Sequence, residues 1–476
     1  MLNSIRSLDP RRLSPSRLLS EPNAPRFLRQ AVIVIATLAL AYNFGRQPSL
    51  TYVYLPVVLV AVWLLYRYPG LAILSLVGAA ILIPFTVGTS SSGSPLNVAY
   101  LGVPVLLAFW LVDMVRARSI QLAPSSTTMP LMGLVVAATL SLVVGNLPWN
   151  VFAQLAPLRA QVGAWGIFAF SAGAFWLTAN RIRDLVWLKR IVWLFLGLGA
   201  VFMFARLSGS LSIRNLFAYG VDGSMFWVWI VVLAAGQALF NTDLLPRWRL
   251  ALGGLVVVTF LVALSPASRG WASGWVPPLV GLALLVGIRW PRSVVLLGLI
   301  AALLALIEFP TVLRLINDYK AYDLLTRGAA LTIVLEIFKA NPLLGVGPAN
   351  YYFYTPLYPI LGYYVRFNSH NNYIDILAQT GLIGMFFFAW FVAAVGRLGW
   401  SLRTKFTDGF ARGYLFACLA GLLGSLVAAA LGDWLLPFVY NIGINGFRAS
   451  VLAWLFLGGV VALEQIARQK TAPALP

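Results

Sequence analysis

The sequence predicts an all-α membrane protein, a polytopic bundle of about fourteen transmembrane helices, with about twelve as the lower count. Hydrophobic residues form 60% of the chain and charged residues only 10%, and the mean hydropathy of +0.86 is too high for a water-soluble domain of this length. The apolar runs are continuous and lack the period-two alternation of barrel strands. Helices must therefore satisfy the backbone groups that lie in lipid.

The candidate spans are apolar runs that lie between polar breaks. The first eleven fall within residues 30–309, at 31–44, 51–66, 71–87, 98–115, 130–144, 162–178, 186–204, 225–240, 250–264, 275–288 and 294–309. The last three fall within residues 373–465, at 373–395, 414–431 and 449–463. Several runs are shorter than the roughly 20 residues that a span needs, so flanking aromatic and small residues must extend them.

The charge pattern predicts the orientation of the chain in the membrane. Most of the 34 Lys and Arg residues fall in alternate connections, with the N-terminus inside, as the positive-inside rule requires. We therefore expect a multi-pass membrane protein with both ends cytoplasmic. Residues 1–29 form a disordered tail before a signal anchor, and residues 466–476 form a second tail. The net charge of +20 is scattered singly between apolar runs, which argues against a nucleic-acid partner.

Residues 310–372 form one long outer (periplasmic) connection, and loops of this length in a compact protein are usually functional. Residues 328–342 place apolar side chains on one helical face, which predicts a short interfacial helix that ends at Asn341-Pro342. The aromatic run at 351–364 is typical of a membrane belt or of a sugar-stacking wall. "GVGPAN" at 345–350 lacks the Lys-Ser/Thr of a phosphate loop, so we interpret it as a turn.

Three arginines and the single histidine lie on the outer side, where positive charge runs against the orientation bias. Arg269 ends the ninth span, Arg327 begins the interfacial helix, and Arg366 precedes His370 by four residues. Guanidinium groups bind diphosphate oxygens and stabilise a leaving diphosphate without a metal or cofactor. A neutral imidazole accepts a proton from an attacking hydroxyl. Together they predict an inverting, metal-independent glycosyl transfer with His370 as the catalytic base.

Structural explanations compete for the same residues. His370 with Asn371 and Asn372 would suit the N-cap of the twelfth span, and the two asparagines are more often caps than catalysts. Asp375 would lie inside that span, where a carboxylate is costly; it either orients His370 or the acceptor, or is an interfacial acid. Three further outward arginines are candidates for the same cavity, and the sequence does not choose between them: Arg159, Arg206 and Arg214. The lone Cys418 excludes an intrachain disulfide and a cysteine metal site.

Three segments, in this order, resemble the signature of the bacterial O-antigen ligase and polymerase superfamily: "SRG" at 268–270, "RGAALTIVLEIFKANPLLGVGPANYYFY" at 327–354 and "SHNNYIDILAQTGLIG" at 369–384. The resemblance implies a GT-C-like membrane glycosyltransferase of the bacterial inner (plasma) membrane that uses an undecaprenyl-diphosphate glycan at the periplasmic face. It implies that Arg269 and Arg327 contact the diphosphate and that His370 acts on the acceptor. Arg366 matches no motif and is included for its position alone.

The resemblance leaves the acceptor open between a growing glycan, for a polymerase, and lipid A-core, for a ligase; fourteen spans are closer to the polymerase branch. Membrane lipids are the other expected partners. The main alternative is a lipid-linked oligosaccharide flippase or other transporter, which should place ionisable residues near the membrane midplane and show repeated discontinuous helices. A protein oligosaccharyltransferase would usually add a soluble domain. The crowding of functional charges on one face favours an enzyme.

Overall fold

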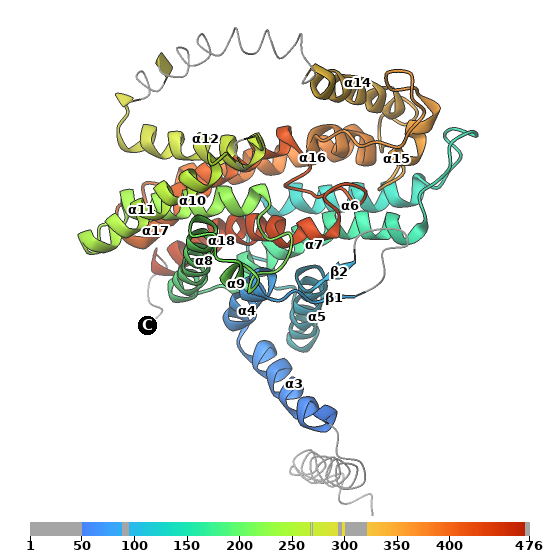
Figure 1. The fold of residues 1–476 in the computed structure, drawn as a ribbon. Coiled ribbons are helices and arrows are strands. Elements are labelled where there is room, and N and C mark those ends of the chain that lie inside the picture. Colours follow the sequence, from blue (N-terminus) through green and yellow to red (C-terminus); the bar gives the residue numbers. More distant parts are fainter. Residues whose placement is uncertain are drawn as a thin grey trace, which may run out of the picture. The chain divides into compact units, whose positions relative to one another are not determined.

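The computed structural model describes residues 50–87, 95–266, 268, 270–293, 298–299 and 321–471. Within these ranges the chain is almost wholly helical (Figure 1). The paired strands among the described residues are β1 (Thr86–Val87) and β2 (Leu96–Asn97), which form a short antiparallel ladder. The predicted all-α class is confirmed.

The first compact unit contains one described helix, α3 (Leu50–Arg67), and the elements that follow belong to the second unit. Its helices are α4 (Pro69–Leu82), α5 (Val98–Ala117), α6 (Thr128–Val144), α7 (Leu158–Arg181), α8 (Leu185–Leu207), α9 (Leu211–Arg214), α10 (Ser224–Phe240), α11 (Pro246–Ala263), α12 (Ala272–Arg289), α14 (Ala321–Phe338), α15 (Tyr351–Tyr354), α16 (Asn372–Leu402), α17 (Gly409–Leu431) and α18 (Phe447–Thr471), with 3-10 turns η2 (Thr355–Leu357) and η3 (Ile444–Gly446).

Each predicted apolar run that falls in the described ranges lies in a helix; the run at 31–44 and most of that at 294–309 lie outside those ranges. The run at 71–87 stops being helical early, because Pro84 disfavours the helical conformation at Ile83, which is extended. Eight of the described helices have the length and apolarity of membrane spans, and α6 and α10 are shorter apolar helices. The total of about fourteen stays a prediction.

The core of the second unit is built on α18 and α10, which are apolar around most of their circumference and almost completely buried. α18 packs against α7, α10, α17 and α5, and α10 packs against α17, α12 and α11. The outer helices expose apolar side chains instead: α11 presents Leu250, Val257 and Leu261 to its surroundings. Such an apolar outer surface fits a lipid environment and would be costly in water.

α16 is not one continuous helix, because it breaks at Gly381, where φ is +67°. The two amides that follow the break donate to the preceding loop: Leu382 N to Pro342 O at 2.8 Å and Ile383 N to Leu343 O at 3.1 Å. The positive φ and the close approach of the loop explain the glycine, since a methyl group at position 381 would overlap the Leu343 carbonyl. The two family-like segments are thus joined to each other at this break.

The loop at 341–350 also docks on α6. Asn350 donates through Nδ2 to Gly145 O at 3.0 Å and accepts at Oδ1 from Ala156 N at 3.0 Å. Ser141 of α6 contacts the carbonyl oxygens of Leu344 and Gln379 with its hydroxyl. The segment "GVGPAN" is therefore a turn, as predicted, and it holds α6 to the first half of α16.

α14 covers the helix that the sequence predicts at 328–342, and it ends before Asn341-Pro342 as expected. Its apolar face does not lie free for the membrane surface. Val334 and Ile337 are buried in a cluster with Tyr351, Tyr354 and Phe438. The helix thus packs on the protein, beside α15 and α16 (Figure 1).

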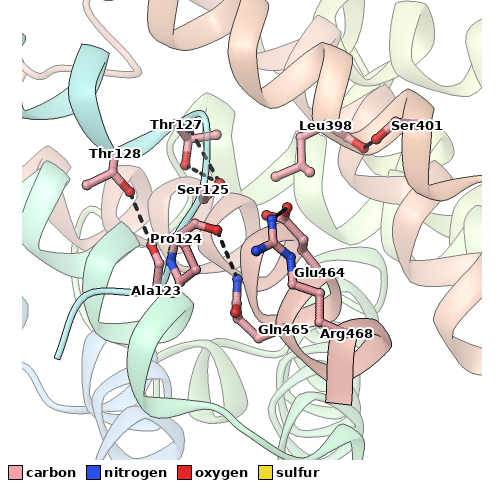
Figure 2. Close-up of polar contacts among 10 residues, drawn as sticks. All are labelled: Ala123, Pro124, Ser125, Thr127, Thr128, Leu398, Ser401, Glu464, Gln465 and Arg468. Atoms are coloured by element: carbon pink, nitrogen blue, oxygen red, sulfur yellow. Dashed lines mark hydrogen bonds and ion pairs between the residues drawn. The ribbon is translucent and has the colours of Figure 1, made fainter. Parts of the chain in front are cut away.

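Different inter-helix connections contact one another at the two ends of the bundle. At one end, the segments before α7, α10, α12, α16 and α18 contact one another, as in the Trp271–Trp434 ring pair. Figure 2 shows the other end of α18, where Gln465 Nε2 donates to Pro124 O at 3.4 Å and Arg468 pairs with Glu464 at 2.6 Å. Connections predicted on one side of the membrane therefore meet at one end of the bundle.

Candidate active site around His370

His370 lies directly before α16, in the left-handed region with φ of +49°, and its side chain is exposed. This conformation is uncommon for a residue other than glycine and is concentrated at functional sites. The imidazole Nδ1 lies 3.3 Å from Nδ2 of Asn441, in the connection between α17 and α18. The chain therefore presents the imidazole at the surface while fixing one of its two nitrogens.

Asn441 links the imidazole to a buried acid. Its Nδ2 donates to Oδ1 of Asp433 at 2.5 Å, and Oδ2 of Asp433 accepts from Phe438 N at 2.7 Å. Asp433 is completely buried, and this burial raises the pKa of Asp433 to about 6. The chain His370–Asn441–Asp433 joins an exposed imidazole to a carboxyl group that titrates near neutral pH.

The orientation of the Asn441 amide decides which nitrogen of a neutral His370 carries the proton. When Nδ2 faces an ionised Asp433, it also donates to Nδ1 of His370, so the proton sits on Nε2. When Oδ1 takes that place, it accepts from a protonated Asp433 and from the Nδ1–H of His370. Only in this second arrangement is Nε2 of His370 unprotonated, as a proton acceptor must be.

Asp375 is hydrogen-bonded to the segment that immediately precedes His370. It lies in the first turn of α16, is 2% exposed, and accepts at Oδ1 from Tyr351 Oη at 2.5 Å and from Ser369 Oγ at 2.7 Å. Burial and the neighbouring Asp375 carboxylate raise the pKa of Tyr351 well above its ordinary value, so Tyr351 remains a donor. Asp375 also interacts electrostatically with Asp433. Its burial differs from that of an interfacial acid at the membrane surface.

Asn371 and Asn372 fasten the start of α16. Asn371 is its N-cap, because Oδ1 accepts from Tyr373 N at 2.9 Å and from Ile374 N at 3.3 Å. Asn372 is buried and binds the connection after α17: Oδ1 accepts from the amides of Leu435 and Leu436, and Nδ2 donates to Leu436 O at 2.7 Å. Both residues position the backbone next to His370.

The predicted arginines differ in their surroundings. Arg327 is exposed in the first half of α14, and Arg269 lies outside the described residues. Its neighbour Ser268 accepts from Arg206 Nη2 at 3.3 Å, and Arg206 also pairs with Asp222 at 3.0 Å. One of the three outward arginines left open by the sequence thus contacts the "SRG" segment.

Arg366 lies over the ring of Phe353, with 4.2 Å between the guanidinium carbon and the ring centroid. Its Nη2 is 3.4 Å from Oε1 of Gln154, in the connection between α6 and α7. Arg214 is exposed on α9. Among the described residues, no group of three or more His, Cys, Asp or Glu side chains is placed to hold a metal ion.

Sequence reasoning did not single out Asp433 or Asn441, which lie 63 and 71 positions after His370 in numbering. A signal for Asp433 was present: it follows an apolar run directly in a chain that has only 14 acidic residues, and an acid at the end of a span is functional by default. Asn441 carries no such signal, because only the fold brings it to the imidazole.

Residues 253–389 match the family model described as O-antigen ligase. The matched region runs from α11 into α16 and contains Arg269, Arg327 and His370. The match confirms the resemblance to the O-antigen ligase and polymerase superfamily. A search among curated proteins finds no match to the chain.

Proposed function

We propose that this member of the O-antigen ligase and polymerase superfamily transfers a glycan from undecaprenyl diphosphate to a sugar hydroxyl at the outer face of the inner membrane. The observation that carries the proposal is the exposed imidazole of His370, held through Asn441 to the buried Asp433. An exposed imidazole backed by a buried carboxyl group is suited to proton transfer.

The proposed reaction is a single displacement at the anomeric carbon. The acceptor hydroxyl oxygen attacks this carbon and loses its proton to Nε2 of His370. The bond between the anomeric carbon and the diphosphate oxygen breaks, and its electron pair leaves with undecaprenyl diphosphate. Attack from the face opposite the leaving group inverts the configuration. His370 can take the proton only when its Nδ1 carries one, which requires Asn441 to present Oδ1 to the ring.

Arg269 and Arg327 are the proposed diphosphate ligands. Two guanidinium groups offset the negative charge that develops on the leaving group, so no metal is needed for the step. Arg327 stands exposed in the first half of α14, where a ligand has access. Asp375, Asn371 and Asn372 act as positioning residues, because each fixes the backbone on either side of His370.

The distribution of buried charge supports an enzyme over the transporter alternative. Among the described residues the buried charged side chains are Asp375, Asp433, Arg448 and Glu464, and each lies near the end of a helix or in a connection. A transporter should place such groups near the midplane. α16 is discontinuous at Gly381, as a transporter helix could be, but the two backbone amides after the break donate to the carbonyl oxygens of Pro342 and Leu343.

The proposal is tested with purified full-length protein and a synthetic undecaprenyl-diphosphate repeat unit, without divalent metal, with products separated on a gel. His370→Ala should lower the transfer rate by about 10²- to 10⁴-fold, the usual contribution of a general base. Arg269→Ala should also lose most of the product. Arg247→Ala, a change at an exposed arginine in the first turn of α11, serves as the control and should keep the wild-type rate.

The pattern of products assigns the acceptor. A ladder of longer lipid-linked glycans indicates a polymerase, and a single transfer that requires added lipid A-core indicates a ligase. No product with either acceptor, from protein that remains folded, would refute the enzyme and favour the transporter.

A further inference from the structure

Arg366 and Gln154 form a polar pair above an aromatic surface. The guanidinium carbon of Arg366 lies 4.2 Å from the centroid of the Phe353 ring, and Nη2 of Arg366 donates to Gln154 Oε1 at 3.4 Å. Arg366 and Gln154 are both exposed, so their remaining donors and acceptors face the surroundings. A guanidinium stacked on a ring is held in place without losing its charge.

The aromatic surface connects this pair to the candidate active site. Phe353 packs edge-on against Tyr440 at 5.5 Å, and Tyr352 stacks on Tyr440 at 4.6 Å with an interplanar angle of 9°. Tyr440 directly precedes Asn441, whose amide binds the imidazole of His370. The polar pair therefore lies on the same connection and ring stack that fix the proposed base.

A second guanidinium follows Gln154 closely along the chain, because Arg159 lies five positions later, in the first turn of α7. The charges of Arg159 and of Arg366 both act on the Tyr440 hydroxyl, which is enclosed and has no hydrogen-bond partner among the described residues. No acidic side chain of the described ranges pairs with Arg159 or Arg366. Two positive charges thus act on Tyr440, and neither arginine forms an ion pair with an acidic side chain of the described ranges.

We propose that Arg159, Arg366 and Gln154, on the Phe353–Tyr440 surface, form a binding subsite for an acidic sugar of the glycan substrate, one that carries a carboxylate or phosphate group. The inference rests on the proposed function and deepens it by naming the substrate class. The guanidinium groups bind the acidic group, Gln154 bonds sugar hydroxyls, and the exposed edges of the rings contact the apolar face of the sugar.

The surroundings favour a sugar over the donor diphosphate, which the sequence also predicts as the ligand of Arg366. A diphosphate is bound best by donors alone, whereas this surface adds an amide acceptor and aromatic rings, which suit hydroxyl and C–H groups. Gln154, Arg159 and Arg366 also come from segments outside the motifs that resemble the family signature.

The test measures binding by the full-length protein in lipid nanodiscs, with three probes: tetragalacturonate, neutral maltotetraose and inorganic pyrophosphate. We expect tetragalacturonate to bind at least about tenfold more tightly than maltotetraose, and to weaken as salt is raised from about 0.05 M to about 0.5 M. Arg366→Gln and Arg159→Gln should each weaken it about three- to tenfold, as exposed charge contacts do. Arg247→Gln, at the exposed arginine of α11, is the control and should bind like the wild type.

Equal binding of the acidic and neutral probes, or wild-type affinity in Arg159→Gln and Arg366→Gln, would overturn the subsite. Pyrophosphate binding that depends on these two arginines, without such dependence for tetragalacturonate, would assign them to the donor diphosphate and also overturn it. Binding requires no transfer, so His370→Ala should retain the affinity while losing glycosyl transfer. Arginine-dependent binding by a wild-type protein that never transfers a glycan would refute the proposed function alone.

Discussion

At the scale of single residues, the proton on Asp433 sets the tautomer of His370. Below its pKa of about 6, Asp433 is protonated, Asn441 presents Oδ1, and Nε2 of His370 is unprotonated; above that pKa, Asp433 ionises and Nε2 carries the proton. The imidazole itself must be neutral to accept the proton, so protonation of His370 accounts for a fall at lower pH. Transfer by the wild type should therefore show a bell-shaped pH profile, with the fall at higher pH due to ionisation of Asp433.

Asp433→Asn should remove that fall. The new amide donates to Asn441 Oδ1 at every pH, so a neutral His370 keeps its proton on Nδ1 and not on Nε2. The measurement is the transfer rate between about pH 5 and about pH 9, where we expect the variant to rise to a plateau. Asp433→Ala, which fixes neither orientation of the Asn441 amide, is the comparison and should transfer at a reduced rate without the alkaline fall. A fall at alkaline pH that persists in Asp433→Asn would contradict the relay.

The neighbouring asparagines 371 and 372 should differ in their contributions to stability. Asn372→Ala leaves the buried amides of Leu435 and Leu436 without their acceptor, at about 1–3 kcal/mol for each buried donor. Asn371→Ala removes a helix cap, which costs about 1 kcal/mol. The midpoint of thermal unfolding in detergent should fall clearly more for Asn372→Ala. Equal midpoints for the two variants would mean that the bonds to the 435–436 segment do not hold α16.

At the scale of elements, the break in α16 is the feature on which the site depends. Gly381→Ala forces an alanine into a backbone conformation that is essentially confined to glycine (φ +67°, ψ −167°), at a cost of about 1–3 kcal/mol, and adds an overlap with the Leu343 carbonyl. We expect a lower unfolding midpoint and reduced transfer, because the half-helix that carries Asp375 loses its anchor. Gly328→Ala is the matched control: no atom lies within 4 Å of the added methyl, and alanine favours the helix by up to about 1 kcal/mol. Wild-type stability in Gly381→Ala would contradict this role of the break.

The helices could be predicted from the sequence, because long apolar runs leave the backbone no other way to satisfy its polar groups in lipid. The end of the helix before Asn341-Pro342 and the turn at 345–350 can also be predicted, because both depend on the local residue types. The break at Gly381 could not be predicted, since it depends on bonds to Pro342 and Leu343 that only the folded chain forms. The sequence indicates His370 as a candidate. It does not indicate the partners Asn441 and Asp433, because only the folded chain brings them to the imidazole.

At the scale of the whole molecule, the second unit separates its polar groups between two ends, with an apolar bundle between them. Arg448, at the start of α18, is buried and donates to Ile83 O at 2.6 Å and Phe85 O at 3.0 Å. Glu464 and Arg468 pair near the other end of the same helix (Figure 2). Charges confined to helix ends fit a protein whose chemistry takes place at a membrane surface rather than along a path through the bilayer.

The orientation of these two ends decides whether His370 can meet a donor at the outer face, and cysteine labelling tests it. Ser208 ends α8 near Arg206, and a chain of contacts through Ser268, Trp271 and Trp434 places it at the His370 end. Ser401, near the C-terminal end of α16, belongs to the opposite end. A membrane-impermeant maleimide added to intact spheroplasts should therefore label Ser208→Cys, and should label Ser401→Cys only after permeabilisation. The native Cys418 is buried, so the unmodified protein is a suitable blank. The reverse pattern would place His370 at the cytoplasmic face and contradict the proposed site of transfer.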